Sequence, residues 1–352
     1  MTSGTLPETS DIPAGDGLEQ DVSGGKKDPL EAGLPTPDQE KLRCVALCWG
    51  GGLGPAGFAR LVAAFGSTRA VLAADPEALH NPALRLTAEQ IAGLTGLGKR
   101  LEDFREQIQE LRGVGVTVAC PWESAYPVLI RGLEHPPPVL CLAGRVLGED
   151  EPAVAIVGTR SPTPEGAQMA RSLGRAFAQE RTTVVSGLAR GCDTAAHLGA
   201  LEGGGRTLAV LGSGIRVITP RENLELARDI SQNGAVISEQ PPQAPPTVGR
   251  LMARNRLQSV LSRGVLVVQS RETGGAMETA RQAQEQGRTV YAVQWPDPEE
   301  EMAQGPRKLL SEGARGLQGP EEVPALRLEL VDHLQRFEKA REHRKAQGSF
   351  DL

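Results

Sequence analysis

The residues of this sequence best suited to chemistry lie in short glycine turns that also carry serine, threonine or arginine. Four of them follow predicted strands: Gly158-Thr159-Arg160-Ser161, Ser186-Gly187-Leu188-Ala189-Arg190-Gly191, Gly212-Ser213-Gly214 and Thr273-Gly274-Gly275. Glycine lets backbone amides face an anion, hydroxyl groups donate to phosphate oxygens, and arginine binds them in bidentate fashion. One such turn alone is more often only a tight connection, but four at one sheet edge favour phosphate binding.

Motifs that recognise a single nucleotide are missing from these turns. Gly158-Thr159-Arg160 does not belong to a G-x-G-x-x-G fingerprint, and no acidic residue ends the next strand to hold a ribose. There is no G-x-x-x-x-G-K-[ST] loop, and no lysine occurs between Lys99 and Lys308. Several phosphate sites without nucleotide-specific residues predict a polyanionic ligand, namely a nucleic-acid backbone.

Arginine supplies the positive charge near the turns. Residues 151–290 contain 16 Arg and 12 acidic residues. Four of these arginines lie on or next to the predicted helix 249–262, namely Arg250, Arg254, Arg256 and Arg263. Together with Arg160 and Arg190 they would line a groove for single-stranded DNA. The alternative, strongest for Arg250 and Arg263, is that a GC-rich genome encodes surface arginine in place of lysine.

The net charge of the whole chain, −6, argues against a broadly basic nucleic-acid binder. Residues 1–40, however, hold nine acidic residues and two lysines, so the remainder carries a net charge of +1. This first segment has no aromatic residue and is rich in Gly, Pro, Ser and Thr, which predicts a disordered acidic tail. The charge distribution therefore indicates a narrow arginine groove and not a diffuse positive surface.

The sequence offers only weak candidates for a catalytic site. Asp193 and His197 stand one helical turn apart, which favours an ion pair or an N-terminal cap over an acid–base dyad. Glu278 is the one carboxylate close to a proposed phosphate turn, and Ser186 is not part of a G-x-S-x-G nucleophile elbow. We expect no enzyme activity, no cofactor and no metal; a nucleotide-processing enzyme that uses Glu278 is the alternative.

The five cysteines are widely spaced and form no CxxC pair: Cys44, Cys48, Cys120, Cys141 and Cys192. Free thiols in a reducing cytoplasm are the simplest interpretation, and a metal clipped by the first two is a weak alternative. No apolar run approaches the ~20 residues of a membrane span, and no secretory signal is recognised. We therefore expect a cytoplasmic protein.

A parallel sheet is needed to bring the phosphate turns to one edge. Apolar, β-branched runs predict six strands at 153–157, 183–186, 207–211, 235–238, 265–269 and 289–293. Amphipathic stretches of helical length separate them, at 165–180, 191–203, 221–232, 249–262 and 275–287. This alternation predicts an α/β fold with a doubly wound, mostly parallel Rossmann-like sheet, extended by strands near 115–142. Ligands of such sheets bind outside the carboxyl ends of the strands.

Helices are expected both before and after the sheet in the sequence. Residues 41–112 predict short helices, with Gly-Leu-Gly turns at 52–54 and 96–98 that suit either helix–hairpin–helix DNA binding or plain helix capping. Residues 306–345 are also expected to be helical, ending in a basic run. The expected organisation is a tail at 1–40, a small all-α domain at 41–112, the sheet domain at 113–317 and a helical C-terminal segment at 318–352.

Several motifs together resemble the DprA/Smf family of DNA-processing proteins. They are Val154-Ala155-Ile156-Val157-Gly158-Thr159-Arg160, Ser186–His197, Ser238-Glu239-Gln240-Pro241-Pro242 and Arg254-Asn255-Arg256. Their order and spacing agree over about 110–315, including Tyr126-Pro127 and Gly313-Ala314. Residues 41–112 resemble the SAM-like or helix–hairpin–helix domain of the family.

The resemblance implies a non-enzymatic protein that binds single-stranded DNA in natural transformation, protects it, loads RecA recombinase and forms a homodimer through the Rossmann-like domain. It carries DNA binding over to Gly158, Thr159, Arg160, Ser186, Gly187, Arg190, Gly212, Ser213, Gly214, Arg254, Asn255 and Arg256, with Thr273, Gly274 and Gly275 closing the groove. Arg250 is added from the charge pattern.

The chain also departs from the family pattern. Leu251 and Met252 stand where an aromatic residue and a proline are common, so a stacking contact worth roughly 1–3 kcal/mol per base is lost. Gln269 replaces a common acidic residue, and the C-terminal winged helix is absent, reduced or truncated. The segment 273–279 partly resembles lysine-decarboxylase-like phosphoribohydrolases, which keeps the enzyme hypothesis open. A scaffold that only contacts RecA is the third hypothesis.

Overall fold

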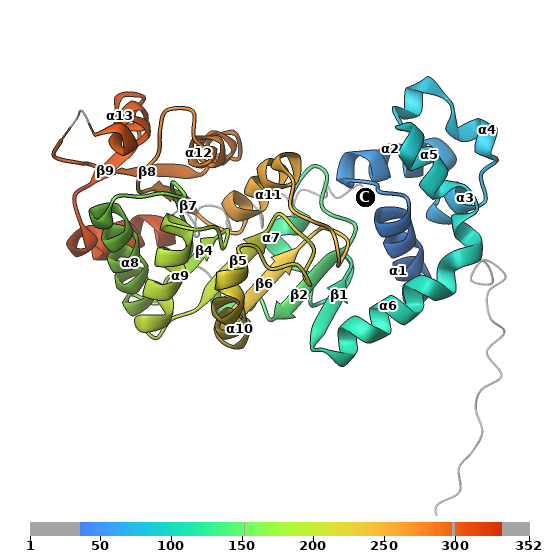
Figure 1. Cartoon of the computed structure of the whole chain (residues 1–352), viewed down its shortest axis with the longest axis horizontal. Helices are drawn as coiled ribbons and strands as arrows, with labels where there is room; N and C mark the ends of the chain where they lie inside the picture. The colour runs from blue at the N-terminus through green and yellow to red at the C-terminus, as the bar shows by residue number, and fades with distance from the viewer. Residues whose placement is uncertain (1–35, 151, 298–299, 333–352) are drawn as a thin grey trace, which may run out of the picture. The chain divides into compact units, whose positions relative to one another are not determined.

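A nine-stranded sheet organises the residues that the computed structural model describes, which are 36–150, 152–297 and 300–332 (Figure 1). The strands are β1 Val116–Ala119, β2 Leu140–Gly144, β3 Ala153–Val157, β4 Thr183–Ser186, β5 Thr207–Leu211, β6 Gly234–Ser238, β7 Gly264–Val267, β8 Thr289–Val293 and β9 Arg315–Leu317. Their order is β1-β2-β6-β5-β4-β3-β7-β8-β9. The pairs β1–β2 and β2–β6 are antiparallel and the others parallel. The predicted doubly wound α/β fold is confirmed.

Helices cover both faces of this sheet (Figure 1). On one face lie α8 Pro164–Gln179, α9 Cys192–Glu202 and α10 Leu224–Asn233; on the other lie α7 Val128–Arg131, α11 Val248–Val260, α12 Gly275–Glu285 and α13 Gln304–Ser311. Successive strand residues point to opposite faces. Val154 and Ile156 therefore join the apolar cluster of α8 and α9, whereas Ala155 and Val157 join that of α11 and α12.

Short helices precede the sheet, as expected. They are α1 Pro37–Val45, α2 Pro55–Phe65, α3 Thr68–Leu72, α4 Pro76–Leu79, α5 Ala88–Leu94 and α6 Leu101–Gly113. Leu42 and Leu111 share one apolar cluster with Val116 and Val118 of β1. The two Gly-Leu-Gly turns lie at the ends of helices. DNA contact by these turns stays a prediction.

The expected tail needs a correction at its end, because α1 begins at Pro37 and not after residue 40. Glu40 lies in this helix and accepts hydrogen bonds from the Thr68 hydroxyl at 2.8 and 2.9 Å. The rest of the tail lies outside the described residues. The described chain from Pro37 onward does not divide into separate compact units, so the domain boundaries at 112/113 and 317/318 stay predictions.

The expectation that 306–345 is helical is wrong at Arg315–Leu317, which form a strand. Helix α13 ends at Ser311, and β9 then extends the open edge of the sheet beside β8, with Gly316 opposite Ala292. Residues 323–332 are helical again. A three-residue strand shows too little alternation of apolar and polar residues to be predicted from sequence. It forms because it pairs with β8. The basic run at 336–345 lies outside the described residues.

The cysteines are buried free thiols, as expected. Four of them, all except Cys192, lie in the apolar cluster that joins the N-terminal helices to the sheet. Within the described residues no group of His, Cys, Asp and Glu could hold a metal ion. No helix in the same residues is long and apolar enough to span a bilayer.

The strand order fixes where a ligand site can form. From β3 the chain proceeds to β4, β5 and β6 on one side, and then returns to β7 on the other side of β3. The loops after β3 and β7 therefore diverge to opposite faces and leave a crevice between them. This is the topological switch point at which doubly wound sheets bind ligands.

Candidate nucleic-acid interface

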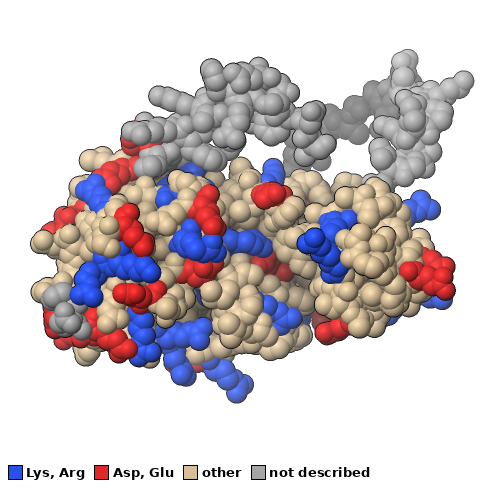
Figure 2. All heavy atoms as spheres, turned by 90° about the horizontal axis from the view of Figure 1, so that it is seen from above, with Lys and Arg blue, Asp and Glu red and all other residues tan. Residues whose placement is uncertain are grey.

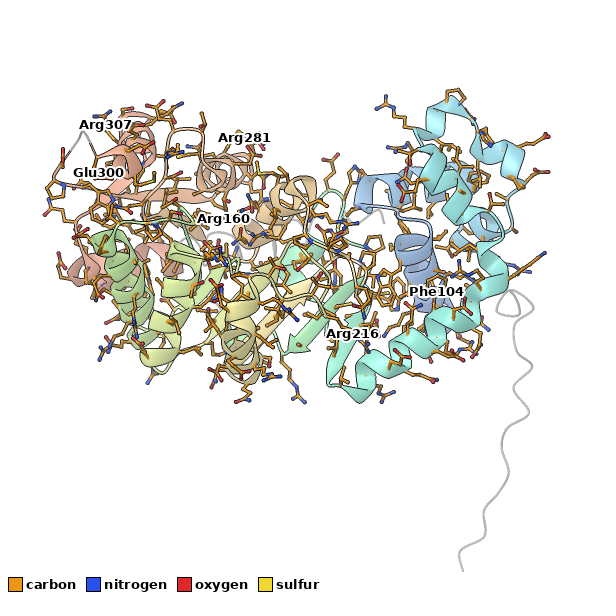
Figure 3. All side chains as sticks on the ribbon, viewed as in Figure 1. Phe104, Arg160, Arg216, Arg281, Glu300 and Arg307 are labelled. Carbon is orange, nitrogen blue, oxygen red and sulfur yellow. The ribbon has the colours of Figure 1, made fainter. Side chains whose placement is uncertain are left out.

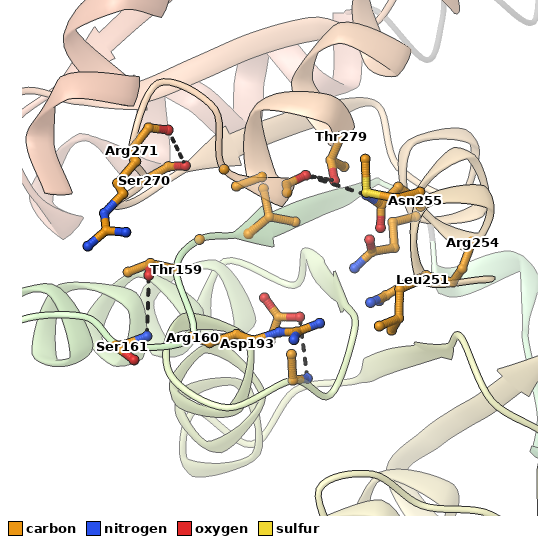
Figure 4. A pocket seen from close by; sticks show the side chains of 18 of the residues that line it. Thr159, Arg160, Ser161, Asp193, Leu251, Arg254, Asn255, Ser270, Arg271 and Thr279 are labelled. Atoms are coloured by element: carbon orange, nitrogen blue, oxygen red, sulfur yellow. Dashed lines mark hydrogen bonds between the residues drawn. The ribbon is translucent and has the colours of Figure 1, made fainter. Parts of the chain in front are cut away.

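A cavity of about 420 Å³ opens at this switch point (Figure 4). Its walls are the loop after β3, the loop after β7, the first turns of α12 and one side of α11. The sequence-predicted residues that line it are Gly158, Thr159, Arg160, Arg254, Asn255, Gly274 and Gly275. We call it the switch-point cavity.

A second cavity, of about 610 Å³, lies at the ends of β4 and β5. It is lined by a further four predicted residues: Gly187, Arg190, Gly212 and Ser213. Arg160, Ala189 and Leu251 line both cavities, so the two adjoin. We call this one the β4–β5 cavity. The two cavities bring together eleven of the sixteen predicted residues.

Arg160 stands where the two cavities meet. Its side chain is exposed and makes no hydrogen bond or ion pair to any residue that the structure describes. Figure 3 shows it among the loops at the strand ends. An exposed guanidinium without a protein partner is free to form bidentate contacts with a phosphate.

Arg254, by contrast, is buried, with 5% of its surface exposed. Its Nη1 donates to the carbonyl oxygen of Val210 at 2.9 Å. The guanidinium rests on Gly187, where any Cβ would overlap it. Gln258, with its amide oxygen turned toward the guanidinium, accepts from Nη1 at 3.1 Å. Arg254 therefore forms the floor of the site rather than its rim.

Asp193 lies beside this floor and holds the β4–α9 loop. Its carboxylate accepts hydrogen bonds from the amides of Gly187 at 3.1 Å and Ala189 at 3.4 Å. Burial raises the pKa of the Asp193 carboxyl, while the positive charge of Arg254 and the two amides lower it. Arg254 thus compensates a buried carboxylate.

The structure supports neither an N-terminal cap by Asp193 nor an ion pair with His197. Gly191 is the N-cap of α9, and the Asp193 carboxylate accepts from loop amides that precede the helix. His197 Nδ1 contacts the Thr207 hydroxyl at 2.7 Å. Burial lowers the pKa of His197 to about 3, so the ring is neutral. A neutral imidazole cannot pair with Asp193 as a cation.

Arg250 and Arg256 face a third region. Both line a cavity of about 630 Å³ on the other side of α11, together with Leu53 and Pro137. Arg256 forms an ion pair with Glu239, which is buried at the end of β6. Burial raises the pKa of Glu239, and the Arg256 charge lowers it. Arg250 donates to the Pro245 carbonyl at 2.7 Å.

Three more predicted residues do not reach either cavity at the strand ends. The Ser186 hydroxyl is buried and donates to the Ile156 carbonyl at 2.6 Å. Gly214 is buried, with its amide donating to Ala244 at 2.8 Å. Thr273 is exposed outside the cavity walls. DNA contact by these side chains is not favoured by their positions.

Sequence reasoning missed several lining residues, among them Ser270, Arg271, Gln258 and Met302. Figure 4 shows Ser270 and Arg271 across the cavity from Arg160. Both lie in the loop after β7, three and four residues beyond Val267, so the strand-end rule could have found them. Gln258 and Met302 carried no such signal, because they come from the side of α11 and from a distant loop.

Two residues singled out in the sequence have structural roles. Gln269 accepts a hydrogen bond from the Thr163 amide at 3.0 Å and donates to the Thr163 hydroxyl at 3.1 Å, which fixes the start of α8. Glu278 is paired with Arg281 and hydrogen-bonded to Gln282 at 2.7 Å. Arg281 lowers the pKa of Glu278, and Glu278 does not line the switch-point cavity.

Two other arginines that line these cavities, Arg190 and Arg271, are already paired with carboxylates. Arg190 makes a bidentate pair with Glu222 at 2.7 and 2.8 Å, and Arg271 pairs with Glu301 at 2.7 Å. Figure 2 shows basic and acidic side chains interspersed over the visible face. The described surface in this view thus has the mixed charge that the sequence predicts.

Comparison with known proteins identifies a family and a similar relative. The family described as DNA recombination-mediator protein A matches residues 117–326. The DNA processing protein DprA of Bacillus subtilis is 34% identical over 258 residues, which cover 71% of this chain and 86% of that protein.

Two solved structures are similar as well. The X-ray structure of DNA processing protein A from Streptococcus pneumoniae has a TM-score of 0.61 and 27% identity, covering 81% of this chain and 97% of that one. DNA processing protein A from Helicobacter pylori, whose structure concerns single-stranded DNA binding, has a TM-score of 0.54 and 31% identity, covering 60% and 95%.

Proposed function

Since the chain belongs to the DNA recombination-mediator protein A family, we propose that it binds single-stranded DNA along the switch-point and β4–β5 cavities. The observation that carries this proposal is Arg160, an exposed arginine without a partner among the described residues, placed between two cavities lined by glycine turns. The similar Helicobacter pylori protein, described as binding single-stranded DNA, supports the ligand class.

The binding would rest on the phosphate backbone. Arg160 offers a fork of donors, and the glycines of the Gly158–Arg160 and Gly274–Gly275 turns let a phosphate come close to the backbone. The amides of Thr159 and Gly274 already donate to the carbonyls of Gln269 and Arg271. Leu251, between the cavities, offers an apolar contact to bases in place of a ring. Little base-edge recognition is expected from such a lining, so sequence preference would be weak.

We further propose that the protein acts without catalysis, protects incoming DNA and delivers it to RecA recombinase during natural transformation, as a cytoplasmic homodimer. The resemblance to the family supports these steps. Each step has its own test. Nuclease digestion of bound oligonucleotides tests protection, RecA filament formation on a coated strand tests delivery, and sedimentation of the protein tests the homodimer.

The primary test is binding of oligo-dT by fluorescence anisotropy across a salt series. Arg160→Ala removes one phosphate contact and should weaken binding about tenfold or more. The slope of log K against log salt should become shallower by about 0.7. Arg175→Ala removes the same charge from an exposed position on α8 that lines neither cavity, and should change little.

The proposal fails if affinity does not change with salt, or if Arg160→Ala binds as well as the wild type. Preference for double-stranded over single-stranded oligonucleotides would also overturn it. Thermal melts of both variants show whether folding is unchanged, which is expected because both side chains are exposed.

A further inference from the structure

The Arg190–Glu222 ion pair separates the β4–β5 cavity from another one. That other cavity, of about 470 Å³, lies between α8 and α9, and we call it the α8–α9 cavity. Its lining includes Gln168, Arg171 and Thr194. Arg190 and Glu222 line both cavities, so the pair stands between them.

The three cavities therefore adjoin in series, the first two at the ends of the strands and the third between α8 and α9. The switch-point cavity shares Arg160 with the β4–β5 cavity, and the latter shares Arg190 with the α8–α9 cavity. An arginine stands at each junction. Arg160 has no partner among the described residues, whereas Arg190 is held by Glu222.

Both partners of this pair are attached to a fixed frame. Asn223, next to Glu222, is buried and donates to the Leu188 carbonyl at 2.9 Å and to the Thr194 hydroxyl at 2.8 Å. The two side chains themselves are 63% and 57% exposed. The backbone cannot move easily, but the side chains can separate at low cost because exposed pairs are weak.

We propose that the Arg190–Glu222 pair is a gate, and that the α8–α9 cavity is a further subsite for a longer single strand of nucleic acid. A phosphodiester entering from the β4–β5 cavity replaces the Glu222 carboxylate on Arg190, and the chain beyond it lies against Gln168 and Thr194. The exchange is one anion for another on the same guanidinium, with no covalent step. The inference rests on the proposed function and extends its groove by one compartment.

The test is Glu222→Gln against the matched control Glu225→Gln. Glu225 pairs with Arg228 on the exposed side of α10, and neither residue lines the three cavities. Binding of an oligo-dT length ladder is measured by anisotropy. Glu222→Gln should strengthen binding about two- to fivefold, only for strands long enough to pass the gate. Glu225→Gln should leave every length unchanged.

A second variant probes the subsite itself. Gln168→Glu places a negative charge in the α8–α9 cavity, on an exposed position of α8. It should weaken binding of the long strands and leave the short ones unaffected. Unchanged melting temperatures would show that each effect is on binding.

The proposal is overturned if Glu222→Gln gives no gain, if the gain is the same for the shortest strands, or if Glu225→Gln gives the same gain. It is also overturned if Gln168→Glu acts equally at all lengths. Failure of the wild type to bind any oligo-dT is a different result, because it refutes the proposed function itself.

Discussion

The charge of Arg254 can be removed by Arg254→Met, which keeps the unbranched inner part of the side chain and removes the guanidinium. In the wild type the guanidinium is buried and hydrogen-bonded to Val210, and the carboxyl of Asp193 is buried next to it. The substitution keeps an unbranched side chain in the same space and leaves Asp193 without its compensating cation.

The expected loss of stability is large. Removing one partner from a set of buried charges costs about 3–5 kcal/mol, because the remaining ion cannot be solvated. Adding Asp193→Asn removes that ion as well and should restore about 1–3 kcal/mol of this loss. Arg250→Met, at a half-buried position of the same helix, removes one hydrogen bond to the Pro245 carbonyl and should cost only about 0.5–1.5 kcal/mol.

The pH dependence identifies the cause. Burial already places the folded-state pKa of Asp193 above its unfolded value. Such a carboxyl contributes stability below the unfolded pKa, and this contribution is lost as pH rises through the folded pKa. Arg254→Met raises the folded pKa further. The difference in unfolding free energy between variant and wild type should therefore be small in acid and grow toward neutral pH.

Urea unfolding at a series of pH values measures this difference. An equal loss at every pH would refute the reasoning, as would a double variant no more stable than Arg254→Met alone. Either result would mean that Arg254 acts through packing and not through its charge.

Three further outcomes are expected. Gln269→Ala leaves the Thr163 amide without its acceptor and should lower the free energy of unfolding, measured with urea, by about 1–3 kcal/mol. A variant as stable as the wild type would show that water replaces the Gln269 side chain as acceptor. Gly187→Ala places a methyl group against the Arg254 guanidinium, which must then move. The free energy of unfolding should fall by a similar amount, and a thermal melt measures this loss. The five thiols are buried, and burial raises the pKa of Cys141 and Cys192 to about 12. Ellman's reagent should therefore react with them only after unfolding, and rapid native reaction would contradict the burial.

Much of the fold was predictable from hydrophobic periodicity, because a doubly wound sheet repeats the same strand–helix unit. The start of β3 and the end of β8 agree with prediction to the residue. β9 was not predictable, because three residues carry no periodicity and depend on the partner β8. The early start of α1 at Pro37 was also missed, since its contact with Thr68 is distant in sequence.

The candidate site was predictable where position alone decides it. Gly158 and Gly274 lie in the cavity because each follows a strand at the switch point. The roles of individual arginines were not predictable, because they depend on partners. Arg160 and Arg256 look alike in sequence, yet only Arg256 meets a buried carboxylate, that of Glu239, which follows β6.

The paired state of Arg190 and Arg271 has a kinetic consequence. A carboxylate beside each guanidinium cancels its field beyond the Debye length of about 8–10 Å. An approaching strand would feel little attraction at a distance, so capture would proceed at the ordinary rate of unsteered encounters. The dependence on salt would then lie mainly in how long a strand stays bound, because the charges act on phosphates that have already entered the cavities.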